Sequence, residues 1–245
     1  MRGKHLINTI IDILYPRRCP VCGGIAVPRG GLACTDCSSR LKPIEEPRCK
    51  KCSKPIDSEE KEYCHDCESK RYHYTNGFSL WIYDECMKKS IADFKYHGRR
   101  EYGEFYVQEL VKKFHDSIMS ISPDVLVPVP IHKSKQLKRG YNQADILAKG
   151  IGKRLNIPVL SYLLKRDKNT LPQKQLNDKE RLKNLEKAFI FDEEERMTYN
   201  GIIDTALLVD DIYTTGSTIE ACTNILMQNG IKKVYFITIS IGKGY

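Results

Sequence analysis

The chain of 245 residues contains 40 lysines and arginines against 31 acidic residues, which gives a formal net charge of +9. Its length suits one α/β domain with a small additional module, and no apolar run approaches the roughly 20 residues of a transmembrane helix. We therefore expect no membrane span, and the moderate positive charge neither requires nor excludes nucleic acid as a partner.

The first predicted element is an amphipathic helix in residues 1–16. The segment contains Asp12 and lacks the small-residue cleavage site of a secretory signal, so we expect a packing helix and a cytoplasmic protein. Its apolar residues fall on one helical face: Leu6, Ile7, Ile10, Ile11 and Leu14.

Cysteine is the next signal along the chain, because eight of the ten cysteines form four C-x-x-C pairs with a constant period of fifteen residues. Each pair directs two thiolates at one metal ion, and a tetrahedral Zn²⁺ needs two pairs. Four pairs predict two structural zinc ions in closed sites, which leave no position open for chemistry. The expected ligands are Cys19, Cys22, Cys34, Cys37, Cys49, Cys52, Cys64 and Cys67.

Spacing alone leaves alternatives for these cysteines. Disulfides would need an oxidising compartment, and iron–sulfur clusters use similar spacings, but zinc is favoured. The pairs could combine sequentially, first with second and third with fourth, or in an interleaved order, and the sequential order is favoured because it is local. We expect a double zinc-ribbon module in residues 17–72, with His65 outside the ligand set. Of the two remaining cysteines, Cys222 is expected in core packing and Cys86 at the start of a helix, and a catalytic thiol at either position is disfavoured.

Residues 73–245 alternate between strand-like and helix-like segments. This alternation predicts an α/β fold with a mostly parallel sheet and helices on both faces. The expected elements are a strand in residues 78–83, helices over Glu85–Tyr96 and Glu101–His115, a strand ending near Val129, a helix over Asn142–Arg154, a strand beginning at Ala206, a helix over Ser217–Gln228 and a final strand over Val234–Ile241.

Two basic segments in this region are candidate anion contacts. The loop expected within Val127–Ala148 has no acid between Asp124 and Asp145, and Arg139 is a forked donor suited to pyrophosphate. The stretch Lys165–Asn184 is polar and could close over a polyanion. Solvated surface loops without function are the alternative in both cases. The candidate residues are His132, Lys133, Lys135, Lys138 and Arg139 in the first segment and Arg166, Lys174 and Arg181 in the second.

The most specific motif is ALLVDDIYTTGSTI, over Ala206–Ile219. Asp210 and Asp211 are expected at the end of a buried strand, where open α/β sheets bind ligands, and adjacent carboxylates suit ribose hydroxyls or a hydrated Mg²⁺. A loop of small and hydroxyl residues at a helix N-terminus suits a phosphate, although it could also be an ordinary capped turn. The loop residues are Thr214, Thr215, Gly216, Ser217 and Thr218.

This motif resembles the loop of the type I phosphoribosyltransferases that binds 5-phosphoribosyl 1-pyrophosphate (PRPP). The resemblance covers the strand, the two acids and the T-T-G-S-T loop, and it implies a sheet of the type I phosphoribosyltransferase kind. It also implies that PRPP binds with Mg²⁺, with its 5-phosphate on Thr214–Thr218, its ribose near Asp210 and Asp211, and its pyrophosphate near Arg139.

Over nearly its whole length the chain resembles the ComF family of competence proteins. The motifs that carry the resemblance occur in the family's order: four C-x-x-C pairs, VPVP followed by Ile131 and His132, RGYNQA at Arg139–Ala144, Thr170, Gln173 and Leu176 before Glu180–Arg181, and the Val209–Thr218 loop; FKYHG at Phe94–Gly98 is a further match. The resemblance implies a zinc module joined to a phosphoribosyltransferase fold, with single-stranded DNA and DNA-uptake or recombination proteins as partners in natural transformation.

Two classes of function stay open from the sequence. In an enzyme that transfers the phosphoribosyl group, the two acids orient the sugar and either could act as a base, with His132 a weaker candidate for proton transfer. In a non-catalytic accessory protein that binds single-stranded DNA, lysines and arginines contact phosphates while Tyr72 or Tyr74 stacks on bases. The acceptor of an enzyme of this kind is not indicated by the sequence.

Overall fold

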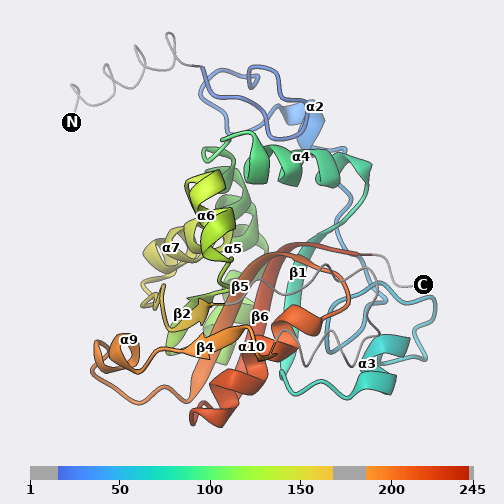
Figure 1. Ribbon diagram of the computed structural model, residues 1–245. Helices are drawn as coiled ribbons and strands as arrows, with labels where there is room; N and C mark the ends of the chain where they lie inside the picture. Colours follow the sequence, from blue (N-terminus) through green and yellow to red (C-terminus); the bar gives the residue numbers. More distant parts are fainter. Residues whose placement is uncertain (1–15, 168–185, 243–245) are drawn as a thin grey trace.

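A four-stranded parallel sheet forms the centre of the computed structural model, which describes residues 16–167 and 186–242. Its order is β1–β6–β5–β2, and every neighbouring pair is parallel (Figure 1). The α/β fold expected from the sequence is therefore confirmed. The strands are β1 (Asn76–Ile82), β2 (Val125–Pro128), β5 (Thr205–Tyr213) and β6 (Lys233–Ile241).

Helices cover both faces of this sheet because its strands are apolar on both sides. In β5, Leu207 and Val209 face one hydrophobic core, whereas Ala206 and Leu208 face another, as the alternation of a strand requires. The first core is covered by α4 (Glu85–Tyr96), α5 (Tyr102–Ile121) and α7 (Gln143–Leu155), and the second by α10 (Ser217–Gln228). No helix in the described ranges has the length and apolar character needed to span a membrane.

The bounds of α4 and α10 agree with those expected from the sequence. In contrast, α5 continues past His115 to Ile121, because Ile118 on its buried face still packs into the core. The two remaining cysteines lie where they were expected: Cys222 is fully buried in the core on α10, and Cys86 is in the first turn of α4, partly buried against the other core.

Strand β5 is longer than expected, since the sequence suggested an end at Asp210 and Asp211. It continues to Tyr213 because β6 extends alongside it, with Ile212 opposite Ser240 and Tyr213 opposite Ile241. The two acids therefore lie within a strand, and the loop begins only at Thr214.

A short helix, α6 (Lys133–Arg139), replaces part of the basic loop expected after β2. His132 caps its start, because its Nδ1 accepts the Ser134 N–H at 3.1 Å. Gly140, in the left-handed region with φ of +79°, ends it. The lysine, glutamine, leucine and arginine residues between them are good helix formers, which explains the difference from the expected loop.

A small antiparallel ribbon lies outside the main sheet and consists of β3 (Leu164–Arg166) and β4 (Phe189–Phe191), followed by α9 (Glu193–Met197). The predicted loop residues Lys174 and Arg181 lie outside the described residues. The same holds for the helix expected in residues 1–16, apart from its last residue.

The zinc-ribbon segment folds as two copies of one local pattern. In each copy a C-x-x-C turn is closed by a residue with positive φ, Gly23 at 75° and Ser53 at 68°, and flanked by an antiparallel bridge. The second pair of each copy lies at the start of a short helix, α2 (Thr35–Ser38) or α3 (His65–Lys70).

The two ribbons pack against different cores of the same α/β fold. Cys19 and Cys37 of the first lie in the core that contains Trp81, whereas Cys49 and Cys52 of the second lie in the core that contains Tyr74. Figure 1 accordingly shows α2 beside α4 and α3 at the opposite end of β1. The connection between the ribbons also pairs with β1, through Pro43 and Trp81. The division at residue 72 stays a prediction.

Candidate functional site

The loop between β5 and α10 has the shape of an anion cradle. Gly216 has φ of +79°, and a Cβ there would lie 2.4 Å from the Tyr213 hydroxyl oxygen, so only glycine fits. Because the cap residue has no side chain, the first N–H groups of α10 are left for a ligand. The hydroxyl oxygens of Thr215 and Ser217 lie 3.1 Å apart at the same end.

The two acids of the motif leave β5 on opposite faces. Asp211 is buried toward α4, where its Oδ1 lies 2.8 Å from Nζ of Lys95. Asp210 is directed toward the other face, where it interacts electrostatically with Arg166 of β3 and Cys222 of α10. Among the described residues, Oδ2 of Asp211 has no hydrogen-bond partner. One buried carboxylate oxygen of the acid pair is therefore left unsatisfied near the end of β5.

Lys95 is a site residue that the sequence did not identify, although it lies in the FKYHG segment. Burial alone would lower the pKa of Lys95, but the charge of Asp211 and the hydrogen bond to it, with a smaller effect of Asp210, raise the pKa instead. Lys95 therefore stays charged beside the buried Asp211 side chain.

Asp210 has a strongly raised proton affinity. Although part of its side chain stays accessible to solvent, burial raises the pKa of Asp210 to about 8, and the charge of Asp211 adds to the effect. The charges of Lys95 and Arg166 and the 2.8 Å hydrogen bond from the Asp211 N–H act in the opposite direction. Asp210 is thus largely protonated at neutral pH in the free protein.

This raised pKa predicts a pH-dependent gain of stability in Asp210→Asn. The favourable contribution of the protonated carboxyl is present below its ordinary pKa of 3.8 and is lost as the pH rises through about 8. The free energy of unfolding of the variant minus that of the wild type should be about 1–3 kcal/mol larger at pH 8 than at pH 5. Urea unfolding at both values measures this, with Asp204→Asn at the other end of β5 as the control.

Arg139, the predicted pyrophosphate contact, is held in place by two neighbours. Its guanidinium donates to Oε1 of Gln143 at 2.9 Å and to the Tyr96 hydroxyl at 3.1 Å, and it stacks 4.7 Å from the Tyr96 ring centroid. Tyr96 follows Lys95 on α4, so the FKYHG segment supports both the acid pair and Arg139.

A group of cations gathers around the two acids from separate elements. Burial lowers the pKa of Lys135, and the nearby charges of Arg166, Arg139 and Lys95 lower it further. Like charges brought this close to one another create a positive potential suited to a polyanion. The group unites the predicted residues Arg139, Arg166 and Lys135 with Lys95.

Three other predicted residues are not among the four cations of this group. His132 caps α6 through Nδ1, which favours its reading as a turn residue rather than a proton-transfer group. Lys138 is exposed on α6. Lys133 lines a pocket of about 320 Å³ between α6, α7 and β3, which Arg166 also lines.

The cysteines form two tetrads in the sequential order favoured by the sequence. One comprises Cys19, Cys22, Cys34 and Cys37, and the other Cys49, Cys52, Cys64 and Cys67; the sulfur atoms of each lie within 4.8 Å of one another. Four Zn–S bonds of about 2.3 Å in a tetrahedron place sulfurs about 3.8 Å apart. The Sγ atoms of Cys52 and Cys64 lie 3.6 Å apart, so the donor set fits a structural zinc ion.

Comparison with protein families matches residues 10–68 to a double zinc ribbon domain. Competence protein F of Haemophilus influenzae is 28% identical over 222 residues, covering 89% of this chain and 93% of that protein. Competence protein ComFC of Streptococcus pneumoniae is 30% identical over 207 residues, covering 82% and 84%. The DNA utilization protein YhgH of Escherichia coli is 30% identical over 112 residues, which cover 46% of this chain and 47% of that protein.

Among solved structures, a purine phosphoribosyltransferase from Pyrococcus horikoshii superposes with a TM-score of 0.34 and 17% identity. The superposition covers 56% of this chain and 73% of that one. A likeness this loose has no bearing on the chemistry of the site.

Proposed function

The chain belongs to the ComF family of competence proteins, and from this premise we propose that its α/β domain binds Mg²⁺–PRPP at the carboxyl ends of β2 and β5. The observation that carries the proposal is the proximity of a glycine-shaped cradle at Thr214–Ser217 to an acid pair surrounded by cations. PRPP combines a phosphate, a ribose and a pyrophosphate, which need these three kinds of group.

Each part of the site has a role in the proposed complex. The cradle holds the 5-phosphate through N–H groups and hydroxyls, and Asp210 and Asp211 contact the ribose hydroxyls and its hydrated Mg²⁺. Lys95, Lys135, Arg139 and Arg166 supply positive charge for the pyrophosphate, with Lys133 and Lys138 at the periphery.

If the bound PRPP is turned over, the same charges stabilise the departing pyrophosphate. Of the two acids, Asp210 is the better candidate base, because a general base works best when its pKa lies near the working pH and the pKa of Asp210 is about 8. Asp211, paired with Lys95, orients the sugar.

Single-stranded DNA is a second candidate ligand, for which a separate pocket gives support. The pocket, of about 300 Å³, lies on the second ribbon and combines cations with the exposed ring of Tyr63, a combination that binds phosphates and stacks on bases. The rings of Tyr72 and Tyr74, which the sequence suggested for stacking, are buried against each other instead. It is lined by Lys50, Lys51, Tyr63, Cys67, Arg71, Tyr72 and Thr75. The eight clustered thiols of the chain suit metal ligands in a reducing compartment, and we propose the cytoplasm as the site of action.

Calorimetric titration of the zinc-loaded protein with PRPP and Mg²⁺ tests the proposal. We expect the wild type to bind, Asp210→Asn to bind at least tenfold more weakly, and Asp204→Asn to bind like the wild type. Both variants replace a carboxyl by an amide, one within β5 and one just before its start, but Asp204 pairs with Lys232 far from the cradle. A folded wild type that does not bind PRPP would overturn the proposal. If the wild type binds PRPP, pyrophosphate release in the presence of candidate acceptors measures whether the bound PRPP is turned over.

A further inference from the structure

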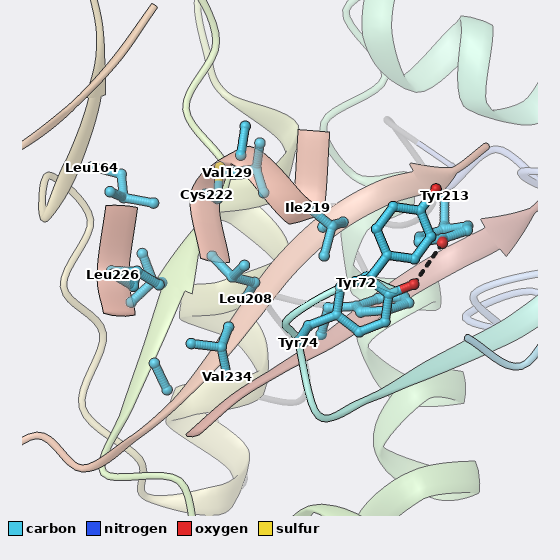
Figure 2. Packing of buried hydrophobic residues seen from close by; sticks show 14 of the residues in the cluster. Tyr72, Tyr74, Val129, Leu164, Leu208, Tyr213, Ile219, Cys222, Leu226 and Val234 are labelled. Atoms are coloured by element: carbon cyan, nitrogen blue, oxygen red, sulfur yellow. Dashed lines mark hydrogen bonds between the residues drawn. The ribbon is translucent and has the colours of Figure 1, made fainter. Parts of the chain in front are cut away.

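The two zinc ribbons differ in their relation to the phosphate cradle, because among the described residues only the second is hydrogen-bonded to it. The Tyr72 hydroxyl, five residues after the last cysteine ligand, donates a hydrogen bond to the backbone carbonyl of Thr215. The hydroxyl oxygens of Tyr74 and Tyr213 lie 2.7 Å apart. Figure 2 shows the three tyrosines side by side in the core, with the Tyr74–Tyr213 hydrogen bond drawn.

These tyrosines also determine the space in which the cradle lies. The rings of Tyr72 and Tyr74 stack with centroids 5.2 Å apart, and Tyr213 stacks on Phe236 at 4.9 Å. A Cβ on Gly216 would lie 2.4 Å from the Tyr213 hydroxyl and 3.1 Å from the Tyr72 ring. The backbone of the cradle therefore rests directly against two aromatic side chains, one of which comes from the zinc-ribbon segment.

Hydrogen bonds to a buried carboxylate join the same segment to the first turn of α10. Glu220 is only 2% exposed, and its carboxylate accepts the backbone N–H of His73 at 2.9 Å and lies 2.5 Å from Nδ1 of the His73 ring. The segment Tyr72–Tyr74 is thus fastened both to the cradle and to the helix that follows it.

The metal-binding turn of the second ribbon fixes the other side of this segment. Nζ of Lys51, between two cysteine ligands, donates to the Tyr72 carbonyl at 2.5 Å, and Sγ of Cys67 lies 3.8 Å from the Tyr74 hydroxyl oxygen. The Ser53 hydroxyl donates to the Gly77 carbonyl at 2.6 Å. The shape of this turn depends on its cysteines being held at one metal ion.

We propose that the second zinc ribbon positions the phosphate cradle, with Tyr72, Tyr74 and Glu220 as positioning residues, and that the first ribbon does not. The ligand named here rests on the proposed function, but the coupling between ribbon and cradle does not. Without this support the loop would have to be ordered at the moment of binding, which weakens affinity for the group that it holds. Loss of the support should lower the affinity for the 5-phosphate. It should leave the affinity for pyrophosphate unchanged, because residues of α4, α6 and β3 hold that group.

The first test is hydrogen–deuterium exchange of the zinc-loaded full chain, read at residues 214–217. Tyr72→Phe removes one hydroxyl, and Tyr63→Phe removes a hydroxyl from the same ribbon at a partly exposed position without a contact to the cradle, so it is the matched control. We expect faster exchange in Tyr72→Phe alone. Unchanged exchange in Tyr72→Phe would overturn the proposal, whatever PRPP does.

The second test compares ligands that occupy different parts of the site. Ribose 5-phosphate and inorganic pyrophosphate are titrated separately, and we expect Tyr72→Phe to weaken ribose 5-phosphate threefold to tenfold, as the loss of one hydrogen bond implies. Pyrophosphate affinity should stay at the wild-type value. A general structural defect would weaken both ligands equally and would contradict a positioning role.

The third test separates the two ribbons. Cys22→Ser and Cys64→Ser each leave three cysteines in one tetrad, and zinc content per chain is measured for both. We expect faster exchange at residues 214–217 only in Cys64→Ser. Equal effects of the two variants would refute the assignment to the second ribbon. If the wild type binds neither PRPP nor ribose 5-phosphate, the proposed function fails, while the exchange data still decide the coupling.

Discussion

Lys95→Met is expected to destabilise the protein by about 3–5 kcal/mol, because it leaves the Asp211 carboxylate in the core without its counter-charge. The side chain of Asp211 is 5% exposed, and its second oxygen already has no hydrogen-bond partner among the described residues. Urea unfolding at pH 7.5 measures the loss.

Two further variants show whether the ion pair is the cause. Lys89→Met makes the same substitution at an exposed position of the same helix and should change stability by no more than about 0.5 kcal/mol. The double variant Lys95→Met with Asp211→Asn removes both charges and should recover most of the loss. A Lys95→Met protein as stable as Lys89→Met would show that the pairing of Lys95 with Asp211 does not stabilise the fold.

The parts of the molecule that the sequence predicted depend on neighbours along the chain. A C-x-x-C turn places two thiolates through local backbone geometry, so the ligands and their sequential grouping could be read from the spacing. The helix after the Thr214–Ser217 loop was predicted for the same reason, since its cap and its apolar period lie within one segment.

What the sequence could not supply are contacts between distant segments. The pairing of Lys95 with Asp211 joins α4 to β5, and the support of Arg139 by Tyr96 joins α6 to α4. The extension of β5 to Tyr213 depends in the same way on the length of β6. The FKYHG segment was a signal for the first two contacts, but no rule of spacing links it to an acid so far along the chain.

The regular cysteine period also conceals a difference between the two ribbons. Two periods before Tyr72, His73 and Tyr74, the corresponding residues are Lys42, Pro43 and Ile44. That earlier segment pairs with the edge of β1, whereas the later one contacts the cradle and Glu220. Equal metal sites can therefore have unequal functions, because the residues that follow the ligands decide what each ribbon contacts.

Zinc removal is expected to destabilise the α/β core together with the ribbons rather than the ribbons alone. A structural zinc ion in a four-cysteine site contributes on the order of 10 kcal/mol of apparent binding free energy, most of an ordinary domain's stability. Here the cysteines of each tetrad belong to one of the two cores that cover the sheet, so each core has an edge made of metal ligands. Thermal unfolding after exhaustive chelation, followed by far-ultraviolet circular dichroism, should show a transition at least 10 °C lower than in the zinc-loaded protein.

The nature of that transition distinguishes this arrangement from a separate metal module. If the ribbons were independent, chelation would abolish their own signal and leave the helices of the α/β domain melting at the original temperature. Cys52 is fully buried in the core of Tyr74 and Tyr213, so Cys52→Ala should reproduce the loss of stability. The control is Cys86→Ala, which changes a partly buried thiol outside both tetrads and should have a much smaller effect. Retention of the original melting temperature in Cys52→Ala would mean that packing alone, without the metal, sets the shape of the core beneath the phosphate cradle.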